Sequence, residues 1–144
     1  MSKNERIRWA DEHLILDKKI LDVKKPIRGV YGIFDGKECL YVGRAYSVYS
    51  RFFDYGGHVQ MMMNGNYPIM KIRLALQERK KLYVKILKQV PFEGKNYYRD
   101  MQKLAYAECC VIETYQRRNQ CLEQLPEGRW MTKELWERII RSTK

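Results

Sequence analysis

The sequence predicts an α+β fold in which a small three-stranded sheet, containing an antiparallel hairpin, is flanked by helices. Two observations predict the sheet: a pair of β-rich segments joined by a glycine-containing turn, and a third such segment far downstream. The helices are predicted because other long segments place apolar residues at helical spacing. The 144-residue length, with 45% hydrophobic and 31% charged residues, is that of a single globular domain, residues 1–144.

The hairpin is predicted at residues 28–35 and 39–45, joined by the sequence DGKE. Gly36 in that turn can adopt a positive φ, which favours a tight reversal of the chain. The third strand is predicted at residues 82–90, LYVKILKQV, because β-branched residues and partial alternation favour extended structure.

The helices are predicted on both sides of these strands in the sequence. The first 25 residues read as one or two amphipathic helices that end before Pro26. Residues 58–66 are expected to form a loop or a frayed helix end. The other helical segments are 47–55, 66–81, the long run 97–118, and a terminal segment capped by Thr132.

Charge is the most informative feature of the composition. The chain has 28 Lys and Arg against 17 Asp and Glu, a net charge of +11, which favours a polyanionic partner such as nucleic acid. This excess does not separate an enzyme from a binding protein. No apolar run approaches the ~18 residues of a membrane span, and the amino terminus lacks the apolar core of a secretion signal. We therefore expect a cytoplasmic protein without a membrane partner.

The cysteines favour free thiols over a metal site. None of the four shows Cys-x-x-Cys spacing, and two of them are adjacent, which suits neither zinc nor an easy disulfide. We expect buried free thiols at Cys39, Cys109, Cys110 and Cys121.

Two tyrosines of the hairpin, Tyr31 and Tyr41, can converge on one face of the sheet. Side chains alternate along a strand, so the parity of the loop decides whether both point the same way. A three-residue loop with Gly36 in the left-handed region would place them diagonally, whereas a two-residue turn would send them to opposite faces. Gly29 and Gly43 flank the pair, and glycine inside a strand often marks a close approach by another backbone or a ligand.

Two charged residues are candidates for the same centre. Arg51 follows Gly43 by eight residues, on the helix after the second strand, where a guanidinium could grip a phosphate. Glu108 is the only charged residue in the stretch LAYAECCVI, and a buried carboxylate is costly unless a cation, donors or a metal compensates it. A salt bridge to a lysine is the structural alternative. For Asn119, near the end of the same helix, the ordinary explanation is C-capping.

These residues together resemble the GIY-YIG nuclease family. GVY at 29–31 corresponds to the first signature and YVG at 41–43 to the second, with nine residues between them. The resemblance spans about residues 28–121 and implies a GIY-YIG-like core with helical extensions at both ends. The family's arginine, glutamate and asparagine have counterparts, in order, in Arg51, Glu108 and Asn119.

The resemblance implies a divalent-metal-dependent endonuclease that hydrolyses phosphodiester bonds of double-stranded DNA. It implies one Mg²⁺ (or Mn²⁺) held by Glu108, with water and phosphate oxygens completing its shell. Arg51 would neutralise charge on the scissile phosphate, Tyr31 would take the proton of the attacking water, and Tyr41 would orient water or phosphate. Asn119 would brace the site. The alternative is an inactive GIY-YIG fold that binds nucleic acid, although loss of the glutamate, arginine or first tyrosine would have signalled it.

The resemblance also extends to residues around the arginine. Tyr55 stands four residues after Arg51, where family members often carry His or Tyr, and is a further catalytic candidate. Arg44 replaces a lysine that often follows the second signature. The segment 58–81 is predicted to track a DNA backbone, with a solvated basic helix as the alternative. The predicted nucleic-acid contacts are Arg44, His58, Lys71, Arg73, Arg79 and Lys80.

Tryptophans near the two termini make a homo-oligomer an option. Trp9, Trp130 and Trp136 lie in or beside the predicted terminal helices, and tryptophan is enriched in the cores of interfaces. The alternative is that these rings pack inside their own protomer.

Overall fold

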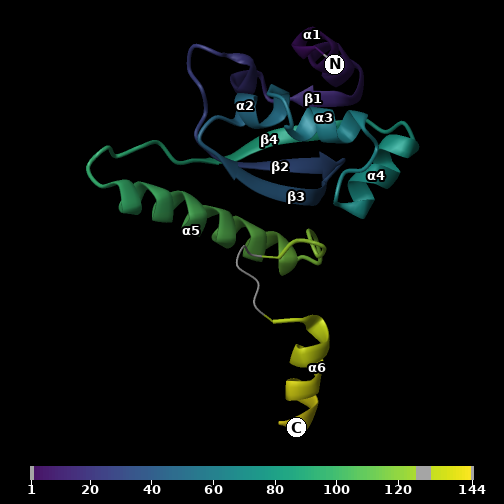
Figure 1. Ribbon diagram of the computed structural model, residues 1–144, viewed down its shortest axis with the longest axis vertical. Helices are drawn as coiled ribbons and strands as arrows, with labels where there is room; N and C mark the ends of the chain where they lie inside the picture. The colour runs from purple at the N-terminus through teal and green to yellow at the C-terminus, as the bar shows by residue number, and fades with distance from the viewer. Residues whose placement is uncertain (1, 126–130, 144) are drawn as a thin grey trace.

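The computed structural model describes residues 2–125 and 131–143, in which helices cover both faces of a mixed sheet (Figure 1). The strands are β1 (Leu14–Leu16), β2 (Gly29–Asp35), β3 (Glu38–Ala45) and β4 (Leu82–Gln89). The helices are α1 (Lys3–His13), the 3₁₀ turn η1 (Lys18–Leu21), α2 (Val48–Phe53), α3 (His58–Met63), α4 (Met70–Gln77), α5 (Tyr97–Gln116) and α6 (Lys133–Ser142). The predicted α+β class is confirmed.

The sheet has a fourth strand, so the prediction of three strands is wrong. The strand order is β1–β4–β2–β3, with β2 antiparallel to both of its neighbours and β1 parallel to β4. Strand β1 begins directly after α1, where Leu14 pairs with Leu82. A three-residue strand is too short for a period of its own, so only its pairing with β4 defines it.

The turn between β2 and β3 differs from the three-residue loop that would bring the tyrosines together. Asp35 pairs with Glu38, which leaves Gly36 and Lys37 as a two-residue turn. Gly36 has the expected positive φ, 58°. By its length alone, this turn would place Tyr31 and Tyr41 on opposite faces of the sheet.

A bulge in β3 restores the shared face. The register between β2 and β3 shifts by one at Leu40, which lies between Cys39 and Tyr41 as an extra residue. One extra residue reverses the alternation of side chains beyond it. Tyr31 pairs with Gly43 and therefore lies diagonal to Tyr41 on the same face.

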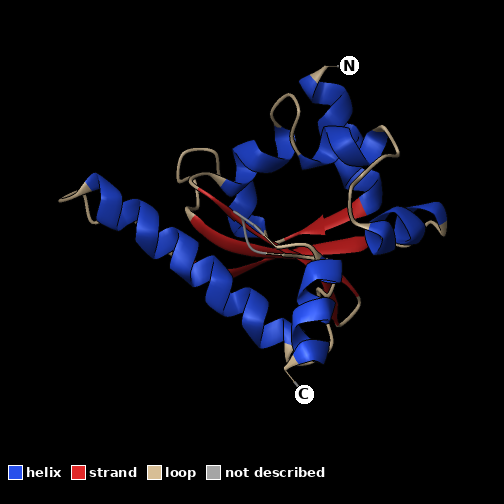
Figure 2. Cartoon of the chain, turned by 60° about the horizontal axis from the view of Figure 1, so that its bottom comes forward, coloured by secondary structure: helices blue, strands red, loops and turns tan. Residues whose placement is uncertain are grey.

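Each face of the sheet has its own hydrophobic core. Helices α1 to α4 pack on the face that carries the tyrosine pair, and α5 packs on the other face (Figure 2). The first core includes Ile20, Tyr31, Ile33, Phe52 and Ile72. The second includes Val30, Phe34, Val42, Leu104 and Ile112. The tyrosines are thus enclosed between the sheet and the short helices α2 and α3.

The predicted helices are confirmed in place but not always in extent. Residues 58–63, expected as a loop or frayed end, form α3, and the helix expected over 66–81 is limited to α4. Helix α6 is capped by the Thr132 hydroxyl, as predicted. None of the described residues of α6 is buried, and the helix stands apart from the sheet in Figure 1.

The tryptophans are divided between packed and exposed positions. Trp9 stacks on His13, with ring centroids 4.1 Å apart, whereas Trp136 on α6 is 51% exposed. Trp130 lies outside the described residues. Within the described residues, no helix is long and apolar enough to cross a membrane.

The four cysteines carry free thiols, but only two of them are buried. Cys39 and Cys121 lie in the core, where the Cys121 thiol donates to the Cys39 carbonyl. Cys109 and Cys110 are exposed on α5, so the expectation that they are buried is wrong. The α5 face that meets the sheet is instead formed by residues such as Leu104 and Ala107.

Candidate functional site

The two hairpin tyrosines form the base of the site. Their ring centroids are 6.3 Å apart, and Tyr31 is fully buried against Phe52 of α2. A Cβ at Gly43 would overlap the Tyr31 hydroxyl, and one at Gly29 would overlap the Lys88 carbonyl. Both glycines therefore mark close approaches, as the sequence predicts, and Gly43 makes room for the Tyr31 ring.

His58 lies beneath the pair and joins Tyr31 to a third tyrosine. The Tyr31 hydroxyl is 2.5 Å from His58 Nε2, and the Tyr67 hydroxyl is 2.7 Å from His58 Nδ1. His58 is only 1% exposed, so its ring is not on the surface where the predicted contact with nucleic acid would form. Burial, assisted by the positive charge of Arg51, lowers the pKa of His58 from its ordinary 6.5 to about 3.

Two opposite charges, those of Arg51 and Glu108, affect the pKa of Tyr31. Burial is the main reason that the pKa of Tyr31 is raised well above its ordinary value of 10.0. The neighbouring Tyr41 and Tyr67 and the carboxylate of Glu108 act in the same direction, whereas Arg51 lowers it. Arg51 on α2 and Glu108 on α5, which come from opposite faces of the sheet, therefore both act on this hydroxyl.

Glu108 is held by an ion pair at the edge of the sheet. Arg44 Nη1 on β3 lies 2.7 Å from Glu108 Oε1, and the two side chains are 28% and 13% exposed. The structural alternative for Glu108, a salt bridge, is therefore present, with arginine instead of lysine as the partner. The pair fixes the carboxylate beside the edge strand β3, close to Tyr31.

A cavity of about 260 Å³ opens next to these residues and is lined by both Arg44 and Arg51. Hydroxyls of Ser47 and Ser50 and the ring of Tyr55, which is 83% exposed, also line it. Of the described residues that line it, Asp54 is the one with a carboxylate. Two guanidinium groups beside hydroxyl donors suit a phosphate group better than a cation.

The carboxylates of the described residues form no metal cluster: no group of three or more His, Cys, Asp or Glu side chains could hold an ion. Among the described residues, Glu108 is the carboxylate whose charge acts on Tyr31, so it is the candidate ligand for an ion there. Mg²⁺ keeps several waters and often uses one or two carboxylates with substrate phosphates, so Glu108 fits a hydrated Mg²⁺ bound together with a phosphate. It does not fit zinc, which needs three or four protein ligands.

Asn119 lies in the turn after α5 and is exposed. Its φ is 61°, and its N–H donates to the carbonyl of Gln116, as expected for a residue that ends a helix. The adjacent Gln120 accepts from the Cys39 N–H near the start of β3, at the other end of that strand from Arg44. The structure thus does not group Asn119 with Tyr31, Arg51 and Glu108.

Three of the basic residues predicted to follow a DNA backbone are engaged within the protein. Lys71 pairs with Glu38 at 2.5 Å, and Lys80 pairs with Asp35 at 3.3 Å, at the turn of the hairpin. Arg73 Nη1 donates to the carbonyl of Tyr67. Arg79 is exposed at the end of α4. These contacts favour the alternative of a solvated basic helix and lie at the far end of β3 from Arg44.

Sequence analysis missed Tyr67 and the glutamines that follow α5. Tyr67 lies in the loop before α4, and only its contact with His58 distinguishes it from the other tyrosines of the chain. Gln124 accepts from the Val42 N–H at 2.8 Å and donates to the Val42 carbonyl, so it closes the open edge of β3. Neither role has a local sequence signal, because both depend on partners far away in the chain.

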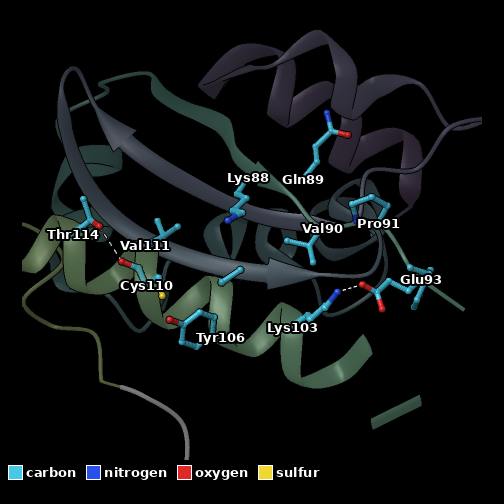
Figure 3. Close-up of a pocket in the computed structure, with 12 residues that line it drawn as sticks. Lys88, Gln89, Val90, Pro91, Glu93, Lys103, Tyr106, Cys110, Val111 and Thr114 are labelled. Atoms are coloured by element: carbon cyan, nitrogen blue, oxygen red, sulfur yellow. Dashed lines mark hydrogen bonds and ion pairs between the residues drawn. The ribbon is translucent and has the colours of Figure 1, made fainter. Parts of the chain in front are cut away.

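A roomier cavity of about 530 Å³ lies away from this centre, between α5 and the end of β4 (Figure 3). An ion pair between Lys103 and Glu93 crosses one end of it. Its other lining residues include Lys88, Val90, Phe92, Tyr106 and Cys110. None of the catalytic candidates lines it, so the small cavity beside Arg44 and Arg51 is the better site for their chemistry.

In comparisons with known proteins, no protein family, characterised protein or solved structure matches the chain. The functional argument therefore rests on the residues and their geometry.

Proposed function

We propose that this protein is a divalent-metal-dependent endonuclease that hydrolyses phosphodiester bonds of double-stranded DNA in the cytoplasm, with a GIY-YIG-like centre. The observation that carries the proposal is the convergence on Tyr31: Tyr41 lies beside it, and the charges of Arg51 and Glu108 both act on its hydroxyl. These four residues come from β2, β3, α2 and α5. The net charge of +11 supports a polyanionic substrate.

Arg51 and Arg44 would bind the phosphate in the small cavity that both residues line. A guanidinium beside the scissile phosphate stabilises the negative charge that grows on its oxygens as water attacks. Arg51 is exposed on α2 and can therefore meet a substrate from solvent. Arg44 is always protonated, so it stabilises charge and transfers no proton.

Tyr31 would accept a hydrogen bond from the attacking water, and Tyr41 would orient the water or the phosphate. Because burial raises the pKa of Tyr31, the residue is a neutral phenol before substrate binds. The positive charge of Arg51 favours the phenolate. Further positive charge entering the site would therefore help Tyr31 release its own proton to water, and the phenolate could then accept a proton from the attacking water.

Glu108 would hold the metal ion. When bound, a hydrated Mg²⁺ or Mn²⁺ would neutralise phosphoryl oxygens and polarise a water molecule. Glu108 is 13% exposed and is already oriented by Arg44, so the carboxylate is fixed before any ligand arrives. Arg44 must then share the carboxylate or turn toward the phosphate in the cavity.

The ion pair between Arg44 and Glu108 favours a second candidate function. Because Arg44 neutralises Glu108, the centre could bind a phosphate through its arginines without holding a metal ion. The protein would then be a nucleic-acid-binding protein that does not cut its ligand.

Incubation with supercoiled plasmid, with and without Mg²⁺, tests the proposal. We expect metal-dependent nicking that Glu108→Ala abolishes, while DNA binding is kept or strengthened because a negative charge is removed. Arg51→Ala should lower the rate about 10²-fold or more, the effect of losing one partner of the transition-state charge.

Two variants at the exposed carboxyl-terminal end of α5 serve as controls. Glu113→Ala removes a carboxylate from α5, and Arg117→Ala removes its ion-pair partner, both away from the sheet. Both variants should cut at the rate of the unmodified protein. Binding without cleavage under every metal condition would reject the nuclease and favour the second function. Cleavage by Glu108→Ala at the full rate would reject Glu108 as the metal ligand.

A further inference from the structure

The contacts of His58 restrict where its proton can lie. Its ring is 1% exposed, and both nitrogens meet tyrosine hydroxyls, at 2.5 and 2.7 Å. A neutral imidazole has one N–H and one bare nitrogen, so it donates to one tyrosine and accepts from the other. Two arrangements are possible, and they assign opposite hydrogen-bonding roles to Tyr31.

In the first arrangement, Tyr31 donates to a bare Nε2, and Nδ1–H donates to Tyr67. The Tyr67 proton would then need another acceptor. His58 is the one hydrogen-bond partner of that hydroxyl among the described residues, and Tyr67 is 1% exposed. A buried donor without an acceptor costs about 1–3 kcal/mol, and in the other arrangement the same cost falls on Tyr31, which is 0% exposed. The surroundings of the two hydroxyls therefore decide between the arrangements.

In the second arrangement, Tyr67 donates to a bare Nδ1, and Nε2–H donates to the Tyr31 oxygen. The Tyr31 proton then points away from His58. The Tyr31 hydroxyl lies against Gly43 of β3, next to Arg44, which holds the Glu108 carboxylate. Tyr41 and Arg51 act on both hydroxyls, whereas the negative charge of Glu108 acts on Tyr31 and not on Tyr67. A hydroxyl proton is attracted toward negative potential, so the proton without a fixed partner is better placed on Tyr31.

We propose that His58 and Tyr67 are positioning residues for Tyr31: Tyr67 holds His58 in the Nε2-protonated form, which donates to the Tyr31 oxygen and turns the Tyr31 proton toward the centre. This role rests on the proposed nuclease function, whereas the protonation pattern does not. His58 then stabilises a Tyr31 phenolate as a hydrogen-bond donor and does not itself collect the proton. Its weak basicity, caused by burial, agrees with this role.

The groups that act on the Tyr31 hydroxyl come from four parts of the fold. Tyr41 lies on β3, Arg51 on α2, Glu108 on α5, and Tyr67 in the loop before α4, and all of them act on the Tyr31 hydroxyl. The positioning pair is therefore one of several influences on Tyr31, and its test needs a direct measurement of the imidazole.

Long-range proton–nitrogen NMR of ¹⁵N-labelled protein at pH 7 measures the protonated nitrogen. The chain has two histidines, so a His13→Gln variant assigns the His58 signals without touching the site. We expect His58 to carry its proton on Nε2. A proton on Nδ1, or an imidazolium, would overturn the proposal whether or not the protein cuts DNA.

Tyr67→Phe tests the coupling, because it keeps the ring and removes only the hydroxyl that donates to Nδ1. We expect the NMR signals of His58 to shift toward the Nδ1-protonated form. We expect kcat to fall about 10–100-fold with KM unchanged, as for other outer partners that orient a reacting group, and the rising limb of the pH–rate profile to move to higher pH. Tyr115→Phe is the control, since this ring packs against Phe34 on the other face of the sheet.

The outcomes separate the two proposals. If His58 carries its proton on Nε2 but the protein never cuts DNA, the nuclease function fails and the protonation pattern stands. If Tyr67→Phe cuts at the full rate with an unchanged pH profile, the positioning role is wrong even in an active nuclease.

Discussion

Gly43 shows at the scale of one residue how the backbone of β3 admits the Tyr31 ring. A Cβ at this position would overlap the hydroxyl and the adjacent ring carbon of Tyr31 and come 2.9 Å from Tyr41. These are side-chain atoms, but the Tyr31 ring cannot move aside freely, because it is fully buried against Phe52 and His58.

Gly43→Ala should therefore lower the free energy of unfolding by about 1–3 kcal/mol, the usual effect of overpacking a core, and should also displace Tyr31. Urea unfolding and plasmid cleavage check this together. Gly94→Ala is the matched control: no atom lies within 4 Å of its added Cβ, and only its φ of 78° is unfavourable. The control should lose some stability but no activity. Equal activity losses in the two variants would contradict the close approach at Gly43.

His58 should make stability depend on acid pH. Its pKa is 6.5 in an unfolded chain and about 3 in the protein. Between these values the unfolded state binds the proton and the folded state does not, so stability is full above pH 6.5 and falls as the pH drops toward 3. The slope from this residue should be about 1.4 kcal/mol per pH unit.

Urea unfolding at several pH values between 4 and 7 measures this slope. His58→Gln should be less stable at pH 7 but should lose this part of the pH dependence. The His13→Gln variant should keep it. An unchanged slope in His58→Gln would mean that other groups cause the acid sensitivity.

At the scale of elements, the segment after α5 completes the sheet that carries the site. Gln120 and Cys121 bond to the backbone of Cys39, and Gln124 bonds to both backbone groups of Val42. The side chains thus occupy the open edge of β3, which would otherwise present unpaired N–H and C=O groups. Glu123 of the same segment accepts from the first N–H groups of α4, which has no side-chain cap of its own.

Gln124→Ala should lower the free energy of unfolding by about 2 kcal/mol, because it removes two hydrogen bonds and leaves buried backbone groups of Val42 unpaired. Hydrogen exchange should speed up at the Val42 amide more than at Ile33, which lies inside the sheet. Gln77→Ala on the exposed end of α4 is the control and should change neither measurement. Unchanged exchange at Val42 in Gln124→Ala would show that this edge is closed in another way.

At the scale of the whole molecule, the proposed function gives each protomer one centre for one phosphate. Each chain carries a single Arg51 and a single Glu108, so a monomer should cut one strand of a duplex at each encounter. The exposed α6, with Trp136 half-exposed, leaves a surface through which two chains could associate.

Light scattering together with a supercoiled-plasmid time course checks this expectation. A monomeric protein should produce nicked circles first and linear plasmid only later. A Trp136→Ala variant should not change the nicking rate, since α6 contributes no residue to the site. Direct linearisation by a strictly monomeric protein, with no nicked intermediate, would contradict the single centre.

The local pattern of the chain already predicted most of the elements. The hairpin, β4, α5 and the Thr132 cap were predicted because β-branched residues, glycine turns, helical spacing and capping hydroxyls act over a few residues. The grouping of Tyr31, Arg51 and Glu108 was predicted from the resemblance of their order and spacing to a nuclease family, and not from the local pattern.

Only the tertiary structure decided the remaining features, because each depends on residues far apart in the chain. The bulge at Leu40 set the face of Tyr41, and pairing with β4 made a strand of residues 14–16. Packing of α3 against the sheet buried His58 between Tyr31 and Tyr67, where sequence alone suggested a surface contact. Arg44 met Glu108 across 64 positions. Sequence thus determined the elements and their chemical groups, and long-range packing determined which of those groups are buried, paired or open to a ligand.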